Sequence, residues 1–137
     1  MNRRCFWHLV AGGLVVASVY PVGRAAGQTT TAGVAGRTTF EVYCASCHGT
    51  SAKGDGPLAS SMKQRPADLT EIAKRNGGTF PGEQVAQIID GRKPVKGHGG
   101  GNMPVWGDAF AKSSDPSPVE EKIQRLVSYL QSIQVKP

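Results

Sequence analysis

The sequence predicts an all-α domain in which a few helices are separated by two long loops, and three observations support that prediction. No segment of four to eight residues alternates apolar and polar side chains in the way of a half-buried strand. In several segments the apolar residues instead recur every three to four positions, which is typical of helices that pack through one face. The 137 residues also include 18 Gly and 9 Pro, a content that favours long irregular connections.

The size and composition of the chain limit what it can be. With 39% hydrophobic and 19% charged residues, a chain of 137 residues fits one small domain and excludes a multidomain enzyme. A domain of this size with so many Gly and Pro residues needs more than side chains to complete its core. We therefore expect a bound cofactor.

Residues 1–27 have the three parts of a secretory signal peptide. Arg3 and Arg4 precede an apolar stretch over 6–22, and small residues follow it, as at a signal cleavage site. We therefore expect export to the periplasm, where the chain is either soluble or, if this segment stays uncleaved, anchored to the inner membrane. The second alternative stays open because the apolar stretch is close to the roughly 17 residues that a membrane-spanning helix needs.

The rest of the chain divides into a tether and one domain. Residues 28–33 are rich in Thr, Ala and Gly and have nothing to bury, so we interpret them as a flexible tether, and the domain covers 34–137. From residue 28 onward there are 13 basic and 10 acidic residues. The basic residues are scattered along an exported domain, so we expect no nucleic-acid partner.

The spacing of apolar residues predicts four helices, over 34–48, 69–75, 81–90 and 118–133. Three residues are expected to mark helix ends: Asp68 as a cap before the second helix, Pro81 at the start of the third and Gly91 as the C-terminal cap of the third.

The last helix is the most strongly patterned, and its start carries a capping signal. Ser117 and Glu120 fit a capping box, with Pro118 at the first helical position. The remaining segments, 49–66 and 91–104, are long loops, and the stretch after Trp106 is interpreted as a linker.

The residues that carry the chemistry are Cys44-Ala45-Ser46-Cys47-His48, a C-x-x-C-H motif, which is the attachment signature of c-type haem. Two cysteines three positions apart on a helical turn can each reach one haem vinyl group. The next residue, His48, is then held beneath the iron and ligates it through one imidazole nitrogen.

Other interpretations of the two cysteines are weaker. Three alternatives for such a pair in an exported protein are a disulfide, a thioredoxin-like redox pair and half of a zinc site. A redox pair belongs in a βαβ frame, and a zinc site of this class needs a second Cys or His pair. Outside the motif and residues 1–27 the sequence has one histidine, His98, and no cysteine.

The sixth iron ligand decides between an electron carrier and an open haem site. Met103 is the main candidate, because it follows a Gly-rich loop that can wrap a flat cofactor and precedes Pro104, which stiffens the backbone. A thioether favours ferrous iron and raises the reduction potential. His98, in the same loop, is the competing candidate and would give a bis-histidine haem.

With these residues the chain resembles the class I cytochrome c family, and specifically its small monohaem bacterial periplasmic members. Gly36, Phe40 and Cys44 are similar to the family's N-terminal helix, and residues 126–130 are similar to its C-terminal helix. In the family the two helices cross closely at the glycine. The segment 103–107 is similar to the methionine ligand segment of its bacterial members. The resemblance implies three to five helices wrapped around one covalently attached haem c.

The resemblance also suggests three further haem-site residues. The segment Gly56-Pro57-Leu58 resembles the family's Gly-Pro-x-Leu loop, and Pro57 then corresponds to the proline whose carbonyl accepts the N–H of the proximal histidine. Arg65 and Trp106 are candidates for hydrogen bonds to the haem propionates.

Together these observations predict a one-electron carrier, and the resemblance implies the same function. We do not expect an enzyme, because the sequence has no paired carboxylates suited to acid–base catalysis. We expect a monomer that meets larger redox proteins: a quinol-oxidising complex or a dehydrogenase as electron donor, and a terminal oxidase or reductase as acceptor. Alternatives are a subunit of a membrane or dehydrogenase complex, and a sensor or peroxidase-like protein with an open distal site. Four lysines are candidates for a weak positive docking ring: Lys53, Lys63, Lys93 and Lys96.

Overall fold

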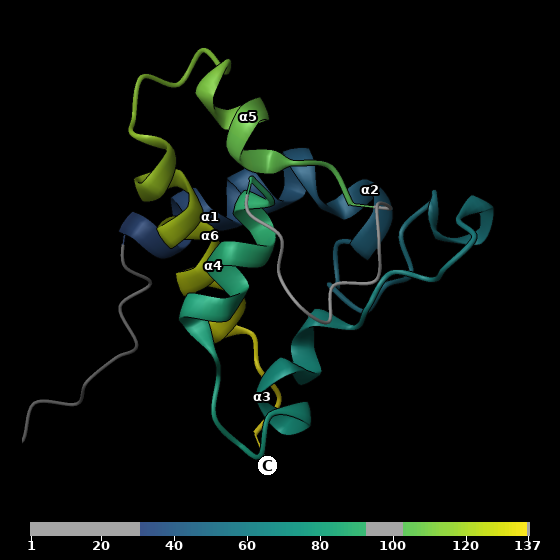
Figure 1. Cartoon of the computed structure of the whole chain (residues 1–137). Coiled ribbons are helices and arrows are strands. Elements are labelled where there is room, and N and C mark those ends of the chain that lie inside the picture. The colour runs from purple at the N-terminus through teal and green to yellow at the C-terminus, as the bar shows by residue number, and fades with distance from the viewer. Residues whose placement is uncertain (1–30, 93–102, 137) are drawn as a thin grey trace, which may run out of the picture.

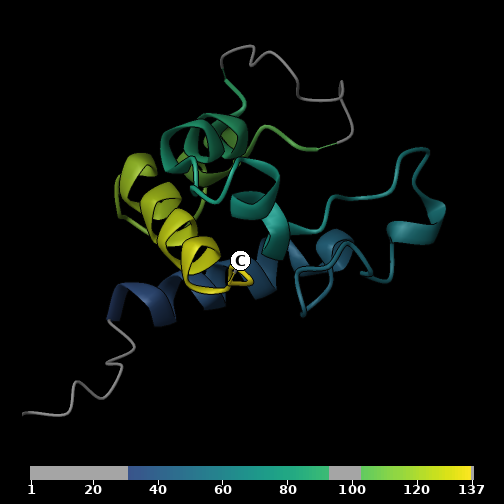
Figure 2. The same cartoon turned by 90° about the horizontal axis from the view of Figure 1, so that it is seen from below.

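Two helices far apart in the sequence, α1 (Thr31–Tyr43) and α6 (Val119–Ser132), lie across each other in the computed structural model of the chain (Figures 1 and 2). The structure describes residues 31–92 and 103–136. The helices between them are α2 (Ala45–His48), α3 (Ile72–Arg75), α4 (Gly82–Asp90) and α5 (Trp106–Ala111), with 3₁₀ turns η1 (Ala59–Ser61) and η2 (Leu69–Glu71). No strand occurs in the described ranges, so the prediction of an all-α domain is confirmed.

The crossing of α1 and α6 depends on a glycine. A Cβ atom built on Gly36 would overlap the carbonyl oxygen of Arg125, so any side chain there would push the two helices apart. Next to this contact the rings of Phe40 and Tyr129 pack with their centroids 5.3 Å apart. Phe40 and Leu126 are each 1% exposed, which places the centre of the core at this crossing.

Helices α4 and α5 also pack against α6. The apolar stripe of α4 faces it through Val85 and Ile89, both 6% exposed. Buried apolar side chains of the described chain form one cluster, made up of Phe40, Ala45, Ala52, Val85, Ala86, Ile89, Phe110, Ile123, Leu126, Val127 and Leu130.

Several predicted helix ends are confirmed. Asp68 caps η2, since its Oδ1 accepts a hydrogen bond from the Thr70 amide at 2.8 Å. Gly91 ends α4 with a φ of +67°, and its amide donates to the Gln87 carbonyl at 3.0 Å. Pro81 immediately precedes α4 instead of occupying its first helical position.

The predicted capping box before α6 is wrong. Pro118 is itself the N-cap residue, with extended backbone, and no side chain caps the helix. The Ser117 hydroxyl instead accepts a bond from Arg125, and its amide donates to Asp115. Glu120 and Glu121 still favour this end of the helix, because carboxylates stabilise the positive end of the helix dipole.

Three other boundaries differ from the sequence prediction. The single helix expected over 34–48 is divided at Cys44 into α1 and α2, and α1 begins at Thr31, inside the segment interpreted as a tether. Helix α5 lies in the stretch interpreted as a linker. It has six residues, too few for an apolar period to show in the sequence.

Some sequence predictions fall outside the described residues. They include the signal peptide or anchor over 1–27, the competing ligand His98, and two candidate docking lysines, Lys93 and Lys96. Among residues 31–92 and 103–136, none of the helices combines the length and apolar character needed to cross a membrane.

Candidate functional site

The Cys44–His48 motif forms one continuous turn that continues α1. The Cys44 amide bonds to the Phe40 carbonyl at 2.9 Å, and the Cys44 carbonyl accepts from the amides of Cys47 and His48 at 3.2 and 2.9 Å. Both thiols are free and half-buried. Two thiols and an imidazole are therefore carried by one turn of the backbone.

The electrostatics of the thiol pair do not suit thiol–disulfide exchange. Burial, and then the neighbouring Cys47, raise the pKa of the Cys44 thiol to about 12. A redox-active C-x-x-C pair works through a thiolate with a lowered pKa. The neutral Cys44 thiol therefore argues against the thioredoxin-like interpretation.

The imidazole of His48 is oriented by a backbone carbonyl. Its Nδ1 lies 3.0 Å from the carbonyl oxygen of Ala67, to which a protonated Nδ1 donates. Burial lowers the pKa of His48, although the bond to Ala67 acts in the opposite direction. A neutral ring with its proton on Nδ1 offers Nε2 as the metal donor.

The partner of His48 Nδ1 in the structure is the carbonyl of Ala67, whereas the resemblance led us to expect the carbonyl of Pro57. The loop after the motif turns back, with the Gly54 amide bonded to the His48 carbonyl at 2.8 Å and the Leu69 amide bonded to the Ala52 carbonyl at 2.7 Å. This return brings Ala67 beside the imidazole. The role of Ala67 was not predictable from the sequence, because a backbone acceptor carries no side-chain signal.

Pro57 and Arg65 lie together at the edge of this loop. Arg65 Nε donates to the Gly54 carbonyl at 3.2 Å, and the Arg65 side chain is exposed. The two residues line one open pocket with Asp55, Gly56, Ala59 and Ser60. An exposed guanidinium beside the haem attachment loop remains available to an anionic group.

Trp106, at the start of α5, belongs to a cluster of three aromatic rings. Its ring stacks on Phe110 with centroids 5.9 Å apart and meets Tyr43 edge-on at 5.6 Å. Tyr43 and Phe110 are themselves 5.3 Å apart. Since Tyr43 directly precedes Cys44, the cluster fixes α5 against the start of the motif. Phe110 was missed because α5 was interpreted as a linker.

Met103 is half-buried and packs against the same buried cluster as Cys44 and Trp106. Its segment leads directly into α5. The fold therefore brings the candidate distal ligand and the attachment motif, which are far apart in the sequence, to one core.

The donor set fits a covalently attached haem. Two half-buried thiols can form thioethers, a neutral imidazole can bind iron, and the thioether side chain of Met103 packs against the same buried cluster as Cys44. In the described parts of the chain, no group of three or more His, Cys, Asp and Glu side chains is gathered as a site for a bare metal ion.

Comparison with known proteins agrees with this donor set. No curated protein and no solved structure matches the sequence. The family model described as cytochrome c matches residues 33–134, which is most of the chain and includes every residue of the site. Members of that family carry out haem-based electron transfer and bind haem c covalently through a motif that Cys44 and Cys47 fit. The chain therefore belongs to the cytochrome c family.

Proposed function

We propose that this chain is an exported bacterial one-electron carrier in which His48 and Met103 are the two axial ligands of the haem iron. The observation that carries the proposal is the position of Met103, half-buried on the core that also packs against Cys44. The haem supplies an iron that takes up and releases one electron.

The protein residues hold this group and limit what it can do. Cys44 and Cys47 attach it, and the Ala67 carbonyl orients the imidazole of His48. Met103 would supply the second iron ligand and would then exclude small ligands such as carbon monoxide. Electron transfer of this kind moves no proton and breaks no bond, so it requires no catalytic acid or base.

Arg65 and Trp106 are proposed as donors to the haem propionates. Arg65 is exposed near the end of the loop that follows the motif, and Trp106 is half-buried beside Tyr43. Each carries an N–H group suited to a carboxylate.

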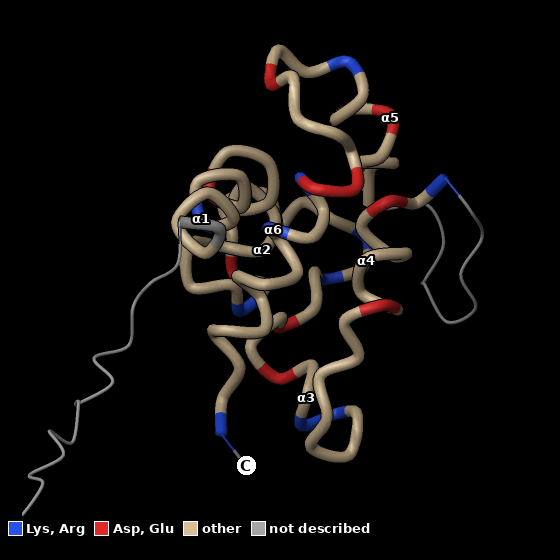
Figure 3. Tube along the Cα trace, turned by 90° about the vertical axis from the view of Figure 1, so that its left-hand side faces the viewer, with Lys and Arg blue, Asp and Glu red and all other residues tan. Residues whose placement is uncertain are grey.

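The partners are proposed to be larger redox proteins, with a quinol-oxidising complex or a dehydrogenase as donor and a terminal oxidase or reductase as acceptor. Lys53 and Lys63 are exposed and available for electrostatic steering. Figure 3 shows acidic and basic residues interspersed along the described chain, which suits weak, transient encounters better than binding to a polyanion.

The decisive experiment is absorption spectroscopy of haem-loaded protein, recorded oxidised, reduced, and reduced with carbon monoxide. We expect the ferric wild type to show the far-red band of a methionine–iron bond. The spectrum of the reduced wild type should not change when carbon monoxide is added. Met103→Ala should lose the band and bind carbon monoxide. Met62→Ala is the matched control, because Met62 is also a half-buried loop methionine.

Three other results have different meanings. Carbon monoxide binding by the wild type indicates an open distal site and a sensor or peroxidase-like function. A missing far-red band without carbon monoxide binding indicates a second nitrogen ligand, and His98→Ala then identifies it. A Met62→Ala variant that loses the band would assign the ligand to Met62.

Export is tested separately. The mass of the mature chain and its distribution between periplasm and membrane distinguish a cleaved signal peptide over 1–27 from an anchor. A chain that keeps residues 1–27 and cofractionates with a membrane complex would be a fixed subunit instead of a free carrier.

A further inference from the structure

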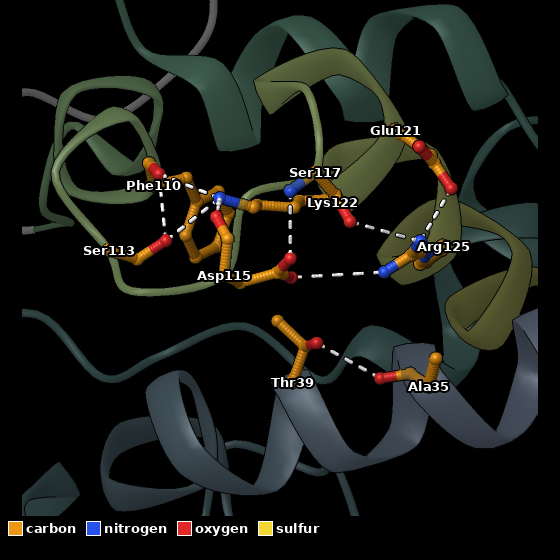
Figure 4. Close-up of polar contacts among 9 residues, drawn as sticks. All are labelled: Ala35, Thr39, Phe110, Ser113, Asp115, Ser117, Glu121, Lys122 and Arg125. Carbon is orange, nitrogen blue, oxygen red and sulfur yellow. Dashed lines mark hydrogen bonds and ion pairs between the residues drawn. The ribbon is translucent and has the colours of Figure 1, made fainter.

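Lys122, on α6, is a buried lysine whose three N–H groups each meet an oxygen. The residue is 5% exposed. Its Nζ donates to the Phe110 carbonyl at 2.9 Å, to Ser113 Oγ at 2.8 Å and to the Asp115 carbonyl at 2.6 Å (Figure 4). A buried ammonium is costly unless it is fully hydrogen-bonded, so these three bonds fix the connection between α5 and α6 strongly.

All three acceptors are uncharged. The nearby carboxylate of Asp115 is engaged elsewhere, since it accepts from the Ser117 amide at 2.9 Å and lies 3.8 Å from Arg125 Nη1. Among the described residues no salt bridge includes Lys122. Its ammonium therefore determines where the chain runs at the end of α5, which an ion pair with one flexible carboxylate would not do.

The segment that Lys122 holds is connected to the haem site through aromatic packing. Phe110, whose carbonyl accepts from Lys122, is 1% exposed and packs against both Trp106 and Tyr43. Trp106 begins α5 three residues after Met103. A shift of Phe110 would therefore move the start of α5 and, with it, the segment that carries Met103.

Helix α5 also packs closely against the end of α4. A Cβ atom built on Gly107 would overlap the Asp90 side chain and would come within 2.9 Å of the Asp90 carbonyl oxygen, so the two helices are in close contact there. The contact with the end of α4 and the Lys122 hydrogen bonds therefore both restrain α5, into which the segment after Met103 leads.

We propose that Lys122 is a positioning residue for the methionine ligand: it holds α5, through the Phe110 carbonyl, so that Met103 stays in place. This inference rests on the proposed function, in which Met103 ligates the iron.

The test compares haem-loaded Lys122→Met with Arg125→Met. Both variants replace a basic residue of α6 that contacts the α5–α6 connection, but Arg125 reaches Asp115 and Ser117 nearer the surface. Two quantities are measured along a denaturant titration: the far-red methionine–iron band of the ferric protein, and helical circular dichroism. The affinity for added imidazole, which competes with Met103 for the iron, is measured in buffer.

In Lys122→Met we expect the far-red band to disappear at denaturant concentrations well below those that unfold the helices. We also expect about a tenfold higher affinity for imidazole, as loss of the hydrogen bonds of one charged group would give. In Arg125→Met the band and the circular dichroism should be lost together. Ser113→Ala removes one of the three acceptors, so it should show the same early loss of the far-red band to a smaller extent. This variant replaces Lys122→Met in the test if Lys122→Met does not fold.

A band that is lost only with the helices in both Lys122→Met and Ser113→Ala, with unchanged imidazole affinity, would overturn the positioning role. The underlying assignment is checked by Met103→Ala in the same assay. If that variant keeps the wild-type spectrum, Met103 is not the ligand, and the proposed role of Lys122 is then wrong as well. If it loses the band while Lys122→Met behaves as wild type, only the positioning role is wrong.

Discussion

Gly36 shows how a single position sets the distance between two helices. The backbones of α1 and α6 approach so closely there that a Cβ atom would overlap the Arg125 carbonyl oxygen. Neither partner can yield cheaply, because both are backbone atoms within helices. The close crossing at Gly36, which the resemblance implies, therefore makes glycine a steric requirement of the fold.

We predict that Gly36→Ala destabilises the protein by about 3 kcal/mol, the upper part of the usual range for overpacking. The free energy of unfolding from denaturant titration measures the effect. Gly82→Ala is the control, since a Cβ atom there would make only ordinary contacts, 3.5 Å from Val127 at the nearest. An equal loss of stability in both variants would mean that the close approach is not the cause.

At the scale of elements, Gln134 joins the end of α6 to the η2–α3 segment. Its Nε2 donates to the carbonyls of Leu69 and Leu130 at 2.8 and 2.7 Å, and its Oε1 accepts from the Ala73 amide at 2.9 Å. The Val135 amide adds a bond to the Thr70 carbonyl at 2.9 Å. The short helix α3, which has four residues, depends on this attachment more than on its own hydrogen bonds.

We therefore expect Gln134→Ala to cost about 2 kcal/mol of stability, because it leaves half-buried backbone groups without partners. Amide hydrogen exchange should quicken first over 69–75, before the rest of the protein opens. The neighbouring exposed Gln131 provides the control variant Gln131→Ala. Uniformly faster exchange throughout α6 and α1 would instead indicate global destabilisation.

The elements that were predictable from the sequence are those whose structure is determined by their own residues. Helices α4 and α6 were predictable because each has a full apolar stripe, and Gly91 marks the end of α4 by its local geometry. Helix α5 was not, because it is held by tertiary contacts of Phe110 and Lys122 that no short segment reveals. The break at Cys44 likewise lies within a continuous helical pattern.

Some residues of the haem site were likewise predictable from local sequence, and others were not. The attachment motif was evident because its chemistry needs fixed spacing of Cys44, Cys47 and His48. The acceptor for His48 was assigned to Pro57 by resemblance, whereas the structure places the Ala67 carbonyl there. Where a loop returns to a side chain depends on the packing of the whole loop, and a single motif does not determine it.

At the scale of the whole molecule, the covalent haem and the protein core are parts of one structure. The half-buried Cys44, Tyr43, Met103 and Trp106 border the buried cluster without being enclosed by it. A small domain with such an incomplete core gains stability from a bound apolar group.

We predict that the double variant Cys44→Ala, Cys47→Ala retains no haem after denaturation, whereas the wild type keeps it, as mass spectrometry of the denatured chain will show. Without the attachment the domain should also unfold at a lower temperature, measured by circular dichroism. Ser46→Ala, inside the same motif, should retain the haem. A double variant that still carries covalent haem would show attachment elsewhere and contradict the assignment.

The pairing of α1 with α6 has a consequence in time. A ribosome makes the Cys44–His48 turn long before it makes Val119–Ser132, so α1 has no partner while most of the chain is being synthesised. Until the last helix is available the core cannot close, and the Cys44 thiol that the finished fold half-buries stays open to solvent. The order of synthesis thus leaves an interval in which the thiols can react before folding shelters them.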